Sequence, residues 1–197
     1  MMFSFHPIIQ SNYGIIHEWL SQLGELPEYR LNNAWSRVNK QLQESSLESA
    51  ALQYYVLFPA HSAKAAFALE HIIGADRLTE WLEYNSHVTV VDVGCGAGAA
   101  SIAFVNCLLN LHENEHIEHP VSVHFIGIDP NENALAIYYQ QLVRLKSEIE
   151  HHDIFLTVKL IAESDLQAVN QLREELARHR TNLNVPFLAH VFCFKQM

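Results

Sequence analysis

Cysteine and basic residues are both scarce in this chain. Three cysteines occur in 197 residues, scattered and odd in number. This usage favours a reducing compartment, the cytoplasm, over a disulfide framework. Lysine and arginine together number 12 against 22 acidic residues, which gives a formal net charge of −10. Because nucleic-acid binders carry a basic surface, the charge disfavours nucleic acid as a partner of this chain alone and favours a small molecule or a protein.

Long hydrophobic runs are also missing. No run approaches the roughly 20 apolar residues of a membrane helix, so no membrane association is predicted. The N-terminus has neither a basic segment nor a small-residue cleavage site, which argues against a secretory signal. A hydrophobic content of 49% in 197 residues fits one domain, or one domain with an appendage, with a buried core.

Histidine is plentiful, with 13 residues, and three of them invite a metal interpretation. His112, His116 and His119 have the spacing of one helix face. They fall in the polar segment 110–120, which ends in proline and is predicted to be an inserted, mobile loop. The segment offers no cysteine and no clear fourth ligand, so no metal site is predicted.

Glycine is scarce as well, with seven residues, yet Gly94, Gly96 and Gly98 fall within five positions after an apolar strand. A strand that turns through such a loop into a helix brings backbone close to a ligand. The spacing also fits the fingerprint of dinucleotide-binding proteins. Asp92 lies two residues before the first glycine, where its carboxylate would repel a pyrophosphate and attract an ammonium or sulfonium group. The residues therefore favour S-adenosylmethionine.

Asp92 and the three glycines resemble, position by position, the first motif of class I S-adenosylmethionine-dependent methyltransferases. The resemblance implies a Rossmann-like fold and S-adenosylmethionine as the cofactor. Cys95 occupies the second position of the loop, as it does in many members of that family. The resemblance thus places Asp92, Cys95 and the glycines in the cofactor site.

Two further acids follow later apolar strands. Asp129 ends the run 124–128, and in the methyltransferases the acid at this place binds the ribose. Glu163 and Asp165 follow the run 154–162, where the family has a residue that approaches adenine; Glu163 is preferred. Each has a structural alternative, since acids also stabilise helix N-termini: Asp129 can stabilise the following helix, and Ser164 or Asp165 can cap the next one.

The order of elements predicts an α/β fold: a Rossmann-like parallel sheet of methyltransferase type, with about four strands, behind an α-helical N-terminal region. We expect the helical region at 1–87 and the cofactor-binding domain at 88–197. Expected helices lie at 12–23, 27–43, 47–58, 59–73, 76–84, 97–111, 131–150 and 166–179. Pro59 is expected to restart a helix that Gly74 ends. The fourth strand is expected at 186–194.

Two weaker resemblances bear on architecture alone. The segment Phe58–Ala63 is similar to one in ribosome-assembly methyltransferase-like proteins of the mitochondrial small subunit. The same region, with the pair Tyr54 and Tyr55, is also similar to GRAS-domain proteins, which share the methyltransferase fold.

The chain stops after its fourth strand, whereas the methyltransferase sheet has seven. We therefore expect a fragment, incomplete at its C-terminus, or else a homodimer through the exposed apolar strand edge, or N-terminal helices packed against that edge. The strand 189–194 also lacks the family's Asn-Pro-Pro-Tyr signature, so methylation of an adenine or of a glutamine amide loses support.

The leading hypothesis is an S-adenosylmethionine-dependent methyltransferase of unknown acceptor, a small molecule or a protein being favoured over nucleic acid. His61 is the candidate base if the acceptor must lose a proton. The alternative is a non-catalytic binding or regulatory module, or a fragment, on the same fold. A nucleotide-dependent oxidoreductase is a third hypothesis.

Overall fold

A computed structural model describes residues 5–23, 46–163, 165–180 and 187–191 of the chain. Within these ranges the side chains of residues 165–166, 179–180 and 187–191 are not described. The expected helix 27–43 and the predicted apolar edge formed by the side chains of the fourth strand therefore lie outside the described residues. Among the described residues, no helix combines the length and the apolar character that crossing a bilayer requires.

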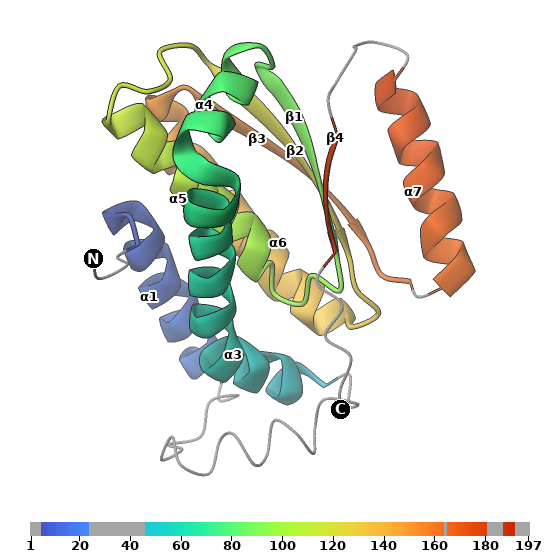
Figure 1. The fold of residues 1–197 in the computed structure, drawn as a ribbon. Coiled ribbons are helices and arrows are strands. Elements are labelled where there is room, and N and C mark those ends of the chain that lie inside the picture. The colour runs from blue at the N-terminus through green and yellow to red at the C-terminus, as the bar shows by residue number, and fades with distance from the viewer. Residues whose placement is uncertain (1–4, 24–45, 164, 181–186, 192–197) are drawn as a thin grey trace.

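A parallel sheet forms the centre of the molecule. Strands β1 (His87–Val93), β2 (Val121–Ile128) and β3 (Ile154–Ile161) pair side by side, and β4 (Phe187–Val191) pairs with the other edge of β1. The strand order is β3-β2-β1-β4 (Figure 1). The carboxyl ends of parallel strands meet at one edge of the sheet, where ligands bind in open α/β folds. The α/β class and the parallel sheet are thus confirmed.

Helices cover both faces of this sheet. Helices α5 (Ala99–Glu113) and α6 (Glu132–Ile149) lie on one face, and α1 (Pro7–Gln22) and α3 (Leu47–Phe67) pack outside them (Figure 1). Helix α7 (Asp165–Arg180) covers the opposite face. Burial on both faces explains the near-continuous apolar strands.

One hydrophobic core joins the N-terminal helices to the sheet. The core contains buried residues of α1 and α3 together with residues of α5, α6 and the first three strands, among them Ile16, Tyr54, Leu108, Tyr138 and Phe125. A second, smaller core lies under α7, where Val91, Ile126, Ile128, Ile161 and Ala168 are buried. The residues of β1 alternate between these two cores, as the pleat of a strand requires.

Helix α3 runs through Pro59 without a break, so the prediction of a helix restart at this proline was wrong. Tertiary packing on both sides of the proline holds the helix together. Before it, the ring of Tyr54 lies 5.4 Å from that of Tyr13 on α1. After it, Ala65 and Ala66 are buried against Ala103 on α5. Such packing outweighs the local cost of an interior proline.

A π-helix continues directly from α3. This element, η1 (Ala68–Gly74), ends at Gly74, whose φ of +93° lies in the region that favours glycine. Helix α4 (Ala75–Glu83) follows. The sequence predicted the stop at Gly74 but not the π-helical winding before it, because no residue pattern distinguishes a π-helix from an α-helix.

Two helix ends differ from the prediction because buried side chains extend the helices. Helix α1 begins at Pro7 rather than at residue 12, since the His6 ring accepts a hydrogen bond from the Ile8 N–H at 3.2 Å. Helix α5 continues to Glu113, into the segment predicted to be a mobile loop. Leu111 and Ile117 are 6% and 2% exposed, so their burial fixes this segment.

Candidate functional site

The glycine loop connects β1 to α5 at the carboxyl edge of the sheet. Gly94, Gly96 and Gly98 all have positive φ angles, of +69°, +51° and +83°. Gly98 is the N-cap of α5, and its left-handed conformation turns the chain from the strand into the helix. The loop therefore has the strand–turn–helix setting that its sequence predicts.

The N–H groups of this loop are largely used within the protein. Those of Gly94 and Cys95 donate to the Ile128 carbonyl at 2.8 and 3.2 Å, and that of Gly98 donates to the Cys95 carbonyl at 2.7 Å. The Gly96 N–H donates to a side chain, the Asp129 carboxylate, at 2.8 Å. A pyrophosphate would need such donors to be available, so the loop is a poor phosphate cradle.

Asp129 lies at the end of β2, beside the loop. Its Oδ2 accepts from the Gly96 N–H, and its Oδ1 accepts from the Asn131 N–H at 2.9 Å. Burial raises the pKa of this carboxyl, and the two backbone N–H groups oppose that shift. A carboxylate oxygen can accept more than one hydrogen bond, so both oxygens keep acceptor capacity for hydroxyl groups of a ligand.

Asp92 is almost fully buried at the end of β1, with 2% exposure. Its Oδ2 accepts from the Ser101 hydroxyl on α5 at 2.9 Å. Burial raises the pKa of Asp92 to about 6, hydrogen bonds from Ser101 lower it, and the charge of Asp129 raises it further. Within the described part of the chain, no basic side chain forms an ion pair with Asp92. A buried acid without an ion-pair partner is a site that a positively charged ligand would stabilise.

Tyr138 of α6 packs against the glycine loop and against β2. Its ring is fully buried, and its hydroxyl donates to the Ser101 hydroxyl that in turn contacts Asp92. A Cβ atom at Gly98 would overlap this ring, and one at Gly127 would come within 2.5 Å of it. These two glycines thus have a packing requirement that is separate from any ligand.

A small cavity of about 60 Å³ opens beside the loop and has Asp92 in its wall. His61 and Lys64 of α3 line it opposite the loop, and Ala99 and Ala100 line it from the first turn of α5. Burial and the nearby Lys64 lower the pKa of His61, so its imidazole is neutral at pH 7. This volume suits one small charged group of a ligand, not an entire cofactor.

Two other predicted site residues, Cys95 and Glu163, are described by the structure. Cys95 lines the same cavity, and burial raises the pKa of its thiol well above the usual range, so it is no nucleophile. Glu163 is half-buried just beyond β3, and no hydrogen bond among the described residues joins it to the loop. The Asp165 side chain and Ser164 lie outside the described residues.

Ser101, Tyr138 and Lys64 belong to the site but were not singled out from the sequence. Ser101 lies in the first turn of α5, but its hydroxyl donates to Asp92 instead of capping the helix, whose N-cap is Gly98, so no capping pattern marks it. Tyr138 and Lys64 have no local signal either. They reach the loop from α6 and α3, and only the tertiary fold brings these helices there.

No family model matches this chain, and no curated protein matches it either.

Proposed function

We propose that this chain binds S-adenosylmethionine at the glycine loop and transfers its methyl group to a small molecule or a protein. The observation that carries the proposal is the pair of carboxylates that flank the loop, Asp92 and Asp129, combined with loop N–H groups that already donate within the protein. Together they favour a cationic ligand with hydroxyl groups over one that carries phosphates.

Each part of the site suits one part of such a ligand. Ionised Asp92 would hold an ammonium group in the small cavity. Lys64 and the first turn of α5 would receive a carboxylate there, since the N-terminus of a helix carries a partial positive charge. Asp129 would accept hydrogen bonds from two adjacent ribose hydroxyls. Glu163, at the end of the next strand, is the proposed partner of the adenine amino group.

Methyl transfer from a sulfonium group requires few catalytic groups from the protein. The sulfonium group, when bound, supplies an already activated methyl group, so the chain must hold the acceptor in line and exclude water. His61 is neutral at pH 7 and lines the cavity, and it is the proposed base for an acceptor that must lose a proton.

Cytoplasmic localisation belongs to the same proposal: Cys95 and Cys107, the two described cysteines, are both free thiols.

Titration calorimetry with S-adenosylmethionine, S-adenosylhomocysteine and NAD tests the proposal. We expect both adenosyl ligands to bind and NAD not to bind. Asp129→Ala should weaken binding by about 1–3 kcal/mol, because charged hydrogen bonds to the ribose are lost. Glu132→Ala, at a neighbouring exposed acid, is the matched control and should leave the affinity unchanged. Failure of both adenosyl ligands to bind at millimolar concentration would refute the proposal.

A turnover assay separates binding from catalysis. A binding or regulatory module would hold S-adenosylmethionine without converting it to S-adenosylhomocysteine in the presence of small amines, thiols or a protein extract. Turnover under these conditions supports the methyltransferase. Tight NAD binding would instead favour the oxidoreductase hypothesis.

A further inference from the structure

A second cavity lies apart from the glycine loop. It measures about 320 Å³ and is formed by η1, α4 and the C-terminal half of α5. Cys107, in its wall, is eight residues beyond the start of α5 at Ala99, which corresponds to about 12 Å along the helix. We call this cavity the Glu70 pocket. Its volume is at the lower end of the range for small-molecule sites.

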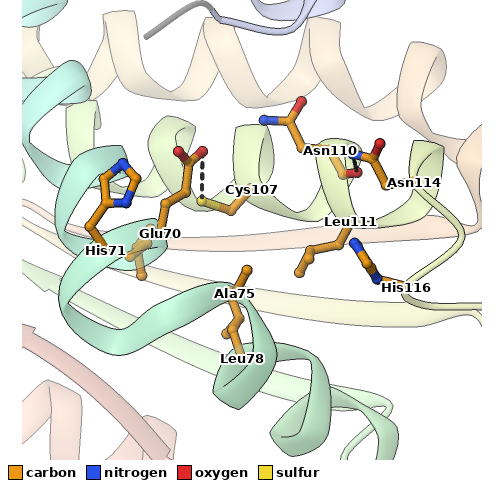
Figure 2. Close-up of a pocket in the computed structure, with 10 residues that line it drawn as sticks. Glu70, His71, Ala75, Leu78, Cys107, Asn110, Leu111, Asn114 and His116 are labelled. Atoms are coloured by element: carbon orange, nitrogen blue, oxygen red, sulfur yellow. Dashed lines mark hydrogen bonds between the residues drawn. The ribbon is translucent and has the colours of Figure 1, made fainter. Parts of the chain in front are cut away.

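The pocket has an apolar floor and a polar rim. Leu69, Leu78, Leu111 and Ala75 contribute apolar surface, whereas Glu70, His71, Asn110, Asn114 and His116 contribute polar groups. Figure 2 shows the Glu70 side chain pointing toward Cys107 on the facing helix. Asn114 donates to the Asn110 carbonyl at 2.7 Å at the far end of the pocket. An apolar body with one polar end would match this lining.

Glu70 decides the charge of the ligand. Its carboxylate is half-buried, and its contact with the Cys107 Sγ, at 3.9 Å, is long and weak. Burial, followed by the Glu70 carboxylate, raises the pKa of the Cys107 thiol to about 12, so the thiol stays neutral. No lysine or arginine lines the pocket, and among the described residues none pairs with Glu70. The negative charge is thus left for a cationic ligand, which the net charge of −10 also attracts.

A metal ion fits the pocket less well than an organic cation. Within the described ranges, no three histidine, cysteine, aspartate or glutamate side chains are arranged so that they could hold a metal ion. The floor is also apolar, which suits carbon rather than a hydrated ion. One wall is π-helical, and π-helical segments are rare and frequently occur at functional sites.

We propose that the Glu70 pocket binds a small organic ammonium ion with an apolar body, its nitrogen on the Glu70 carboxylate and its carbon skeleton against the leucines. The proposal concerns η1, α4 and the end of α5, and it does not depend on what binds at the glycine loop.

Benzylamine, benzyl alcohol and benzoate provide a matched set of probes, one cationic, one neutral and one anionic. Each is titrated into isotopically labelled protein, with the amide resonances of Glu70, Cys107 and Leu111 as reporters. We expect benzylamine to cause saturable shifts at these amides, with benzyl alcohol weaker and benzoate without effect. Glu70→Gln should weaken benzylamine at least about ten-fold and leave benzyl alcohol unchanged.

Two variants control this experiment. Glu80→Gln makes the same change at an exposed glutamate of α4 outside the pocket, and benzylamine binding should not change. Ala75→Leu adds bulk at an exposed lining position and should weaken both benzylamine and benzyl alcohol, so the test survives if Glu70→Gln fails to fold. The proposal is overturned if benzylamine causes no saturable shift at the reporters, if benzyl alcohol binds wild type as well as benzylamine does, if folded Glu70→Gln binds benzylamine as tightly as wild type does, or if Ala75→Leu weakens neither ligand.

Discussion

At the scale of single residues, the ring of Tyr138 occupies the space that a side chain in place of Gly98 would need. Gly98→Ala should therefore lower the free energy of unfolding by about 2–4 kcal/mol, through overlap with the ring and a strained positive φ. Gly96→Ala is the matched control, because its φ is also positive but nothing lies within 4 Å of the added Cβ. It should cost only about 1 kcal/mol. Urea denaturation compares the two, and equal losses would contradict this role of Tyr138.

Asp92 makes the stability of the protein depend on pH. Burial raises its pKa to about 6 in the folded state, against 3.8 for an unperturbed aspartate, so the folded state binds the proton more tightly. The stability that this proton contributes is fully present below pH 3.8 and is lost as the pH rises through about 6. Asp92→Asn cannot ionise and escapes this loss. It should be more stable than wild type at pH 7, by up to roughly 3 kcal/mol.

Thermal or urea unfolding of both proteins between pH 4 and pH 7 measures this difference. Asp92→Asn and wild type should differ little at the acidic end, and the gap should widen as the pH rises. A gap that stays constant with pH, or one that favours wild type at pH 7, would show that the Asp92 carboxylate is not held against its ionisation.

The same residue predicts a pH dependence of ligand binding. An ammonium group needs Asp92 in its ionised form, so the affinity for S-adenosylmethionine should rise as the pH increases through about 6. Asp92→Asn should bind more weakly and lose this dependence. Calorimetric titrations at pH 5 and pH 7 compare the two proteins, and an unchanged pH dependence in the variant would remove Asp92 from the site.

At the scale of elements, His6 joins the first helix to α5. Its backbone N–H donates to Asn106 Oδ1 at 2.8 Å, and its Nε2 lies 2.7 Å from the Glu113 carboxylate. His6→Ala should lower the free energy of unfolding by about 1–3 kcal/mol and increase amide hydrogen exchange in α1. His151→Ala, at an exposed position, should change neither. Exchange in α1 that is unaffected by His6→Ala would show that α1 is held by its apolar face alone.

The sequence predicted those elements well whose conformation is determined by neighbouring residues. The apolar strands, the glycine loop and the acids at the strand ends follow from alternation and turn chemistry. Pro59 shows the limit, because its local cost is overcome by rings and alanines on α1 and α5. The π-helical winding of 68–74 creates the wall of the Glu70 pocket, and no local signal marks it.

The site was partly predictable for the same reason. Asp92 and Asp129 lie at the ends of neighbouring parallel strands, so strand order alone brings them to the loop. Lys64 and His61 come from α3, and Tyr138 comes from α6. Their places depend on how the helices pack over the sheet, and the motif at residues 92–98 contains no information about that packing.

At the scale of the whole molecule, the charge of −10 predicts a poor affinity for polyanions. The chain should not bind duplex DNA or single-stranded RNA in a mobility-shift assay at low salt, because it has few cations with which to displace counterions. Salt-sensitive binding of either polymer would contradict this expectation and would reopen nucleic acid as the acceptor.

The central claim is that an adenosyl ligand binds at the glycine loop. Titration of labelled protein with S-adenosylhomocysteine tests it most directly, with the amide of Gly96 as the reporter because this N–H donates to Asp129. The account predicts saturable shifts at Gly96, Gly98 and Asp129 and none at Cys107 or Leu111 in the Glu70 pocket. Unchanged resonances around the loop at millimolar ligand would contradict it.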